Sequence, residues 1–293
     1  MKRNYLLFAS VCLMAMMLMT SCTQRFPGYK KTDKGLYYKF YSKNASATQP
    51  KPTDILKVQM TCYLKDSLYY DFQQAGGEVI MQQMESSFSG DLFEAYAMMH
   101  VGDSASFYVK ADSVAMKYYG LNPDSVGLQK DDYFRYEVRL VEVQTQEEFM
   151  AELERSKEAL KAESEKAFAE YLEANGITEH TDSGLYYSKS KVTNGAMPQV
   201  GQIARITFVA SYLDGFPLGD SDQLGGYYDL HFGKNWSLAG LEEGVGLMHV
   251  GEKGRFVLPY KLAYGDKAFQ SIPAYSNLVY DVELLELVNE TND

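Results

Sequence analysis

The side chains that could carry covalent or metal chemistry are few in this sequence and lie far apart. Its 293 residues include only three cysteines and four histidines. No two cysteines form a Cys-x-x-Cys pair, and no cysteine–histidine group has the spacing of a metal site. The sequence therefore predicts no metal and no cofactor, which leaves open chemistry that needs neither.

Cys22 is the cysteine whose context predicts a modification. A basic start, MKR, precedes the apolar run YLLFASVCLMAMMLM, the layout of a secretory signal. The junction LMTSC resembles the bacterial lipobox, in which the cysteine is acylated and becomes the mature N-terminus. We therefore expect a lipoprotein signal peptide at 1–21 and a membrane anchor at Cys22. The alternative is a plain signal peptide followed by a chance cysteine.

Thr23, rather than an aspartate, follows that cysteine. By resemblance to lipoprotein sorting in bacteria with two membranes, this favours the outer membrane, with the protein facing the periplasm. The predicted location is thus the bacterial cell envelope.

Cys62 lies in the strand-like run LKVQMTCYL. A lone thiol among apolar residues is more often a small buried side chain than a nucleophile. The formal net charge of −11, with no basic stripe to offset it, argues against nucleic-acid binding because a phosphate backbone would be repelled.

Two halves of the sequence repeat each other. Thr181 follows Thr32 by 149 residues (181 − 32), and other motifs recur at that offset or close to it. A repeat this long predicts two globular copies rather than a solenoid. The matching pairs are TDKGLYYK (32–39) with TDSGLYYSK (181–189), MMHVG (98–102) with LMHVG (247–251), and RYEVRLVEV (135–143) with VYDVELLEL (279–287).

These matches divide the chain into a tether at 22–35, a first domain at 36–145, a helical linker at 146–180, a second domain at 181–289 and a tail at 290–293. The linker contains EEFMAELERSKEALKAESEKAFAEYLEANG, which lacks proline and interior glycine and carries apolar residues at helical spacing. Asn175-Gly176 is a stop signal. The helix is interpreted as a strut or docked arm; a coiled-coil dimer seam is the alternative, which the thin apolar stripe disfavours.

The second copy shows the pattern of an α+β domain. ARITFVASYL (204–213) alternates apolar and polar residues like a half-buried strand. In WSLAGLEEGVGLM the spacing becomes helical: Ser237 is placed to cap, and Glu242 falls on the face opposite the leucines. Strand patterns return at GRFVLPY and NLVYDVELLEL, which predicts an antiparallel sheet packed on a short helix.

The ordered series YLDG, FGK, LAGLEEGVGLMHVGEKGRFVLP, AYG, IP and LVYDVELLEL resembles the FKBP-type peptidyl-prolyl cis-trans isomerases over about residues 185–289. The resemblance implies two FKBP-like domains, each a curled antiparallel sheet around a short helix, joined by a long α-helix. It also implies an apolar, aromatic pocket between sheet and helix in the second domain.

The implied reaction is rotation about X–Pro peptide bonds. Amide resonance imposes a barrier of about 18–20 kcal/mol, and uncatalysed exchange takes tens to hundreds of seconds. A dry aromatic cavity disfavours the polar planar amide relative to the twisted transition state, so no nucleophile or metal is needed.

The resemblance also assigns roles to single residues. Tyr264 would donate its hydroxyl to a substrate carbonyl, and Leu238 would offer a backbone N–H. Phe208 stands where the family carries a tyrosine, and Asp220 matches the family's aspartate only if one residue is inserted in GFPLGDSD. The expected catalytic set is Tyr264, Leu238, Phe208 and Asp220; the expected substrate-binding set is Leu218, Tyr228, Leu241, Ile272 and Tyr280.

The first copy departs further from the family pattern, because FGK is absent and Asp91 replaces Gly240. We interpret residues 36–145 as a divergent copy that binds client chains or serves in packing. The residues that align with the pocket of the second copy are Met60, Tyr70, Asp71, Leu92, Tyr119, Gly120 and Tyr136.

Three functions follow as hypotheses. The first is a prolyl isomerase that assists protein folding in the envelope, acting on unfolded or proline-containing polypeptides. The second is a non-catalytic chaperone or peptide-binding lipoprotein that keeps the pocket for docking. The third is a structural adaptor lipoprotein.

Overall fold

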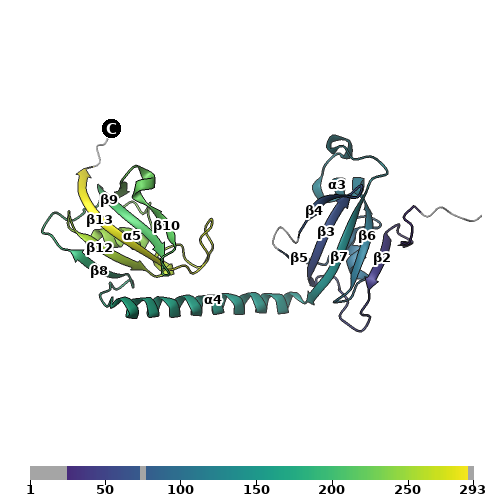
Figure 1. Cartoon of the computed structure of the whole chain (residues 1–293), viewed down its shortest axis with the longest axis horizontal. Coiled ribbons are helices and arrows are strands. Elements are labelled where there is room, and N and C mark those ends of the chain that lie inside the picture. The colour runs from purple at the N-terminus through teal and green to yellow at the C-terminus, as the bar shows by residue number, and fades with distance from the viewer. Residues whose placement is uncertain (1–24, 73–76, 290–293) are drawn as a thin grey trace, which may run out of the picture. The chain divides into compact units, whose positions relative to one another are not determined.

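The computed structural model describes residues 25–72 and 77–289. The chain divides into two compact units, residues 1–152 and 153–293, whose described parts run from purple to teal and from teal to yellow in Figure 1. The predicted signal peptide at 1–21, Cys22 and the predicted tail at 290–293 lie outside the described residues. Within the described part, none of the helices is both long and apolar enough to cross a bilayer.

The first unit is an antiparallel sheet with short helices. Its strands are β1 (Lys30–Lys31), β2 (Tyr37–Ser42), β3 (Ile55–Leu64), β4 (Ser67–Asp71), β5 (Val79–Gln82), β6 (Ser104–Lys110) and β7 (Tyr133–Gln144). Its helices are α2 (Leu92–Ala97), α3 (Ala111–Tyr119) and the 3-10 turn η1 (Pro123–Val126).

The second unit has the same kinds of element. Its strands are β8 (Tyr186–Lys191), β9 (Gln202–Tyr212), β10 (Pro217–Asp220), β11 (Tyr228–His231), β12 (Lys253–Leu258) and β13 (Leu278–Asn289). Its helices are α5 (Ala239–Gly246) and the 3-10 turns η2 (Ser221–Leu224) and η3 (Tyr260–Leu262). The long helix α4 (Gln146–Asn175) connects the two units along the chain.

The two sheets share one strand order. The first runs β2-β6-β7-β3-β4 with β1 beyond β2, and the second runs β8-β12-β13-β9-β10. Each sheet has one further strand: β5 pairs with β3 in the first sheet, and β11 pairs with β9 at the equivalent place in the second. The predicted α+β fold of two like domains joined by a long helix is confirmed.

Helix α5 packs into the core of the second unit. Leu241, Val245 and Met248 are buried in one cluster with the sheet residues Phe256 and Leu284. Leu241 and Val245 lie four residues apart and share one face of α5, as the helical pattern predicts, and Met248 follows the end of the helix.

The start of α5 differs from the prediction. Leu238 occupies the N-cap, and no side chain caps the helix. The Ser237 hydroxyl is instead hydrogen-bonded to the Tyr228 hydroxyl at 2.9 Å. The predicted cap by Ser237 is therefore wrong, because the tertiary fold offers this hydroxyl a partner on β11.

Helix α4 is held at both ends. In the first unit, Lys57 Nζ donates to Glu152 Oε1 at 3.2 Å. In the second unit, the C-terminal turns bury Leu172 in a cluster with Val257 and Val279 on the sheet. The helix ends at Asn175, and Gly176 follows with a φ of 64°, the left-handed conformation that glycine adopts without strain.

The described part of the predicted tether packs on the first unit. Phe26 stacks on Tyr108 with ring centroids 3.7 Å apart. Arg25 pairs with Asp131 at 3.1 Å, and β1 pairs with β2 in the sheet. Residues 25–31 are therefore part of the folded surface of this unit.

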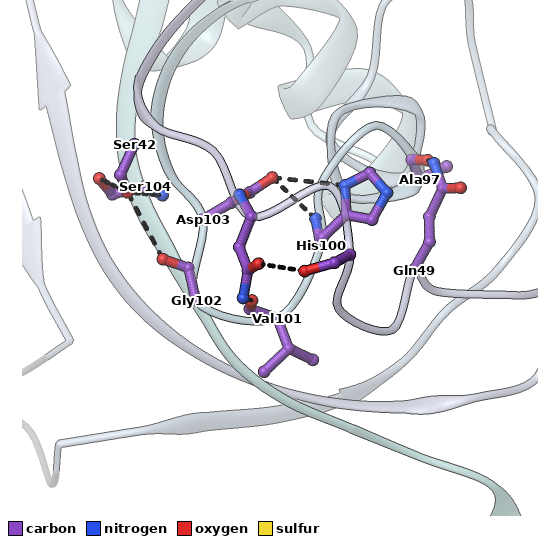
Figure 2. A network of polar contacts seen from close by, with 10 residues as sticks. Ser42, Gln49, Ala97, His100, Val101, Gly102, Asp103 and Ser104 are labelled. Carbon is purple, nitrogen blue, oxygen red and sulfur yellow. Dashed lines mark hydrogen bonds and ion pairs between the residues drawn. The ribbon is translucent and has the colours of Figure 1, made fainter.

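A buried acid secures the turn after the short helix in each unit. Figure 2 shows Asp103 facing the backbone and the ring of His100, whose N–H donates to Asp103 Oδ2 at 2.9 Å. In the second unit the buried Glu252 accepts from the His249 N–H at 2.9 Å and from Lys189 Nζ at 2.8 Å. The repeated MHVG motif thus carries a repeated structural device, in which histidine backbones bind a carboxylate.

Candidate functional site

A cavity of about 310 Å³ opens in the second unit. Its walls come from β9, β10, η2, the loop between η3 and β13, and β13 itself. The cavity therefore depends on segments that are distant in sequence and that the sheet brings together.

Six of the nine predicted site residues line this cavity, and three do not. Leu241 is only 4% exposed and lies in the core beneath. Leu238 and Tyr228 are half-buried and pack against the same core without lining the cavity. The lining six are Phe208, Leu218, Asp220, Tyr264, Ile272 and Tyr280.

Aromatic rings form much of the inner wall. Tyr280 on β13 lies opposite Ala210 on β9 in the sheet register, where the small alanine leaves the ring exposed to the cavity. Phe208 lies two residues before Ala210 on the same face. Its ring centroid is 5.6 Å from that of Tyr280 and 6.0 Å from that of Tyr228. These contacts fix the rings against one another.

Tyr264 brings a hydroxyl to the cavity wall. Burial raises its pKa, so the group is a neutral donor at physiological pH. None of the described residues is hydrogen-bonded to this hydroxyl. Burial likewise raises the pKa of Tyr280 well above its ordinary value. Both side chains can therefore donate to a carbonyl oxygen but do not act as bases.

Asp220 has a structural task at the edge of the cavity. Its carboxylate accepts from the backbone N–H of Gln223 at 3.1 Å and so caps the turn η2. Its strand β10 carries an irregular register against β9 between Pro217 and Gly219. The irregular register lies in the segment where the resemblance requires one inserted residue.

The sequence did not point to several residues around the cavity. Phe269 stacks on Tyr264, with centroids 4.9 Å apart and ring planes 12° apart. Leu224 is an exposed lining residue contributed by η2. The buried Ser221 hydroxyl accepts from the Phe208 N–H at 3.2 Å and ties η2 to β9. No local pattern marks these residues, since their roles arise from loop conformations.

The interior of the cavity is less polar than its mouth. Among the lining residues, the buried and half-buried ones are apolar or aromatic apart from Gly219 and Asp220. Gln223, Gln270 and Ser271 are exposed at the mouth. An apolar group can thus enter the interior, while polar groups remain near water.

A larger depression of about 750 Å³ lies on the outer face of the same sheet. Its walls include the ion pairs Arg255–Asp281 and Lys253–Glu283, both 2.8 Å long. These four charges are paired, Asp220 and Asp222 add two further carboxylates, and the surface is polar. It is poorly suited to an apolar ligand.

Neither metal nor thiol chemistry is supported in the described part of the chain. Residues 25–72 and 77–289 contain no group of three His, Cys, Asp or Glu side chains placed to hold a metal ion. Burial raises the pKa of the Cys62 thiol to about 12, which keeps it protonated and unreactive.

Comparison with known proteins gives a match in the second unit. Residues 195–285 match the family model described as FKBP-type peptidyl-prolyl cis-trans isomerase. An FKBP-type peptidyl-prolyl cis-trans isomerase FkpA of Aeromonas hydrophila is 40% identical over 134 residues, which are 45% of this chain and 49% of the relative. The FKBP-type 22 kDa peptidyl-prolyl cis-trans isomerase of Escherichia coli is 33% identical over 132 residues, 45% of this chain and 63% of the relative.

The chain therefore spans about half the length of the first relative and less than two thirds of the second. Among solved structures, FkpA from Escherichia coli matches with 24% identity and a TM-score of 0.42, over 50% of this chain and 74% of that one.

Proposed function

Because residues 195–285 belong to the FKBP-type peptidyl-prolyl cis-trans isomerases, we propose that the chain accelerates rotation about X–Pro bonds in polypeptides. The proposed site is the 310 Å³ cavity of the second unit. The observation that carries the proposal is that Tyr264, Tyr280 and Phe208, drawn from three segments, line one cavity with an apolar interior.

The chemistry requires only a change of environment. The planar X–Pro amide is stabilised by resonance, and charge separation in that form is favoured by water. When the proline ring lies against Phe208 and Tyr280, its amide would lose the water that stabilises the planar form. Catalysis then follows because the twisted amide, which is less polar, is destabilised less than the planar one.

The polar groups would orient the substrate. The Tyr264 hydroxyl is not engaged by the described residues and would donate to a substrate carbonyl. The backbone N–H of Leu238, at the start of α5 and outside the cavity lining, would supply a second donor to a part of the substrate that extends beyond the cavity. Asp220 would act through η2, which it caps, and Leu218, Ile272, Tyr228 and Leu241 would shape the apolar surroundings.

A protease-coupled assay with a tetrapeptide containing Leu-Pro tests the proposal on the full chain. We expect the slow cis-to-trans phase to accelerate in proportion to protein concentration. Leu224→Lys, which places a charge at an exposed position of the mouth, is expected to reduce the acceleration about tenfold, a loss of about 1.4 kcal/mol. A rate equal to that in buffer would remove the enzymatic proposal.

A peptide-binding function without catalysis is the second candidate. Two residues favour it. The Asp220 carboxylate already accepts hydrogen bonds from Gln223, and Phe208 has no hydroxyl to offer a substrate. Binding of the tetrapeptide with no acceleration would select this candidate.

We also propose that the chain is a lipoprotein of the bacterial envelope, anchored through Cys22. The proposal rests on the LMTSC junction and the preceding apolar run. Expression in a diderm bacterium with radiolabelled palmitate should give a labelled protein in the membrane fraction, and Cys22→Ser should abolish the label. Labelling of the Cys22→Ser variant would contradict this assignment.

A further inference from the structure

The first unit contains a cavity of its own, about 380 Å³ in volume. It lies at the same place in the repeated fold. Cys62 on β3 lies opposite Tyr136 on β7, as Ala210 on β9 lies opposite Tyr280 on β13. Cys62 and Tyr136 both line the cavity, so a small residue again faces a tyrosine across two central strands.

Five of the seven residues that the sequence aligned with the pocket of the second copy lie around this cavity. Met60, Tyr70, Leu92, Tyr119 and Tyr136 all line the cavity of the first unit. The two remaining residues of that alignment, Asp71 and Gly120, do not.

The lining of this cavity differs in kind from that of the second unit. Each of its lining residues is aliphatic, aromatic or a sulfur-containing apolar residue. The second cavity includes a carboxylate at Asp220 and amides at Gln223 and Gln270, and the first has no counterpart of them. Apart from tyrosine hydroxyls the first cavity offers no polar side chain, so a charged group that entered it would lose water without an ionic partner.

Apolar side chains also surround the mouth. Tyr69, Tyr70, Tyr119, Leu121 and Val126 line the cavity and are each between 45 and 71% exposed. They come from two segments, β4 and the stretch from the end of α3 to η1, which the fold brings together. Such a grouping of exposed apolar residues around a cavity marks an interaction site.

We propose that this cavity binds a large apolar side chain of an extended polypeptide and does so without requiring proline. The interior is large enough for an aromatic or long aliphatic side chain, whose burial away from water favours binding. The tyrosines at the mouth add flat apolar surface together with hydroxyl groups that can bond the backbone of the bound segment.

The choice of a polypeptide as the occupant rests on the proposed function, because the equivalent cavity of the second unit would accept one. The proposal adds a second, chemically different site to the chain. The second unit would select X–Pro segments, and the first would hold uncharged apolar segments.

Binding of a fluorescein-labelled, proline-free peptide rich in Leu and Phe to the full chain tests the proposal by fluorescence anisotropy. Leu121→Lys and Val126→Lys place a charge at the mouth from positions exposed enough to leave folding intact. Each is expected to weaken binding about tenfold. Met116→Lys is the matched control, because Met116 is equally exposed on α3 but does not line the cavity.

Isomerisation of the proline tetrapeptide is measured on the same proteins. Leu121→Lys should leave it unchanged, whereas Leu224→Lys should lower it and leave binding of the proline-free peptide unchanged. If isomerisation is absent but the peptide still binds in a Leu121-dependent manner, the proposed function fails and this inference stands.

Three outcomes would overturn the inference. One is unchanged peptide binding in both Leu121→Lys and Val126→Lys. Another is an equal loss in Met116→Lys, which would indicate a general charge effect. The third is a concentration-dependent dimer that Leu121→Lys dissociates, since the occupant would then be a second copy of this chain.

Discussion

Tyr264 is the residue on which the proposed chemistry depends most directly, because its hydroxyl reaches the cavity and is not bonded to the described residues. We predict that Tyr264→Phe lowers kcat/KM for a Leu-Pro tetrapeptide about threefold to tenfold, the effect of losing one neutral hydrogen bond. The melting temperature should stay the same, since the ring and its stacking on Phe269 remain.

Tyr186→Phe is the matched control, because Tyr186 lies on β8 and packs against Phe168 of α4, away from the cavity. It should retain full activity. An equal rate for Tyr264→Phe and the unaltered protein would reduce Tyr264 to a packing residue.

Glu252 shows how a single buried charge ties stability to pH. Burial alone would raise the pKa of its carboxyl, but hydrogen bonds from Lys189, from the His249 N–H and from the Thr193 N–H lower the pKa to about 2. In the unfolded chain the pKa returns to its ordinary 4.5. The stabilisation is therefore fully present above about pH 4.5 and is lost as the pH falls toward 2.

We predict that Glu252→Gln lowers the free energy of unfolding by about 2 kcal/mol at pH 7, because charge-assisted hydrogen bonds are lost in a buried site. Urea denaturation from pH 7 to pH 3 measures the effect. The difference in free energy of unfolding between the variant and the unaltered protein should become smaller as the pH falls. Glu173→Gln, on the exposed surface of α4, should change little, and a gap independent of pH would contradict the role given to the charge.

At the scale of elements, helix α4 and the loop before β13 are joined through one amide. Asn277 Nδ2 donates to the Ser164 carbonyl at 2.9 Å, and Asn277 Oδ1 accepts from the Tyr260 N–H at 2.7 Å. Ser164 in turn donates its hydroxyl to the Tyr275 carbonyl at 2.6 Å. The last turns of α4 are therefore part of the second unit, and they brace the loop that carries Tyr264.

We predict that Asn277→Ala destabilises the second unit by about 2–3 kcal/mol, because it leaves buried polar groups without partners. It should also lower isomerisation, through the altered position of the loop. Thermal unfolding followed by circular dichroism measures the first effect. Asn194→Ala, at an exposed position, serves as the control. If Asn277→Ala and Asn194→Ala unfold at one temperature, the bracing role is refuted.

At the scale of the whole molecule, two units with the same strand order carry cavities of different chemistry. Each unit has its own buried core, so each is expected to fold by itself. We predict that residues 146–293 alone keep kcat/KM for a tetrapeptide within about twofold of the full chain.

The same fragment should assist the refolding of a whole protein less well than the full chain does, because the first unit would no longer hold apolar segments. Refolding yield of a proline-limited substrate protein measures this. Loss of both activities in the fragment would show that the domains have been assigned the wrong tasks.

The sequence by itself determined the duplication, the α+β class, the long helix and its end at Asn175, because offsets, periodicity and stop signals are local or repeated features. It also pointed, through family motifs, to six residues that share one cavity. These features can be predicted without knowing which distant residues are in contact.

Only the tertiary structure decided where individual polar groups act. Glu242, predicted on the exposed face of α5, is buried and accepts from the Gly233 N–H at 2.6 Å, because a loop folds over that face. Ser237 bonds Tyr228 instead of capping the helix, and Leu241 lies in the core rather than on the cavity wall. Helical spacing defines which residues share a face, but what covers that face depends on segments far away in the chain.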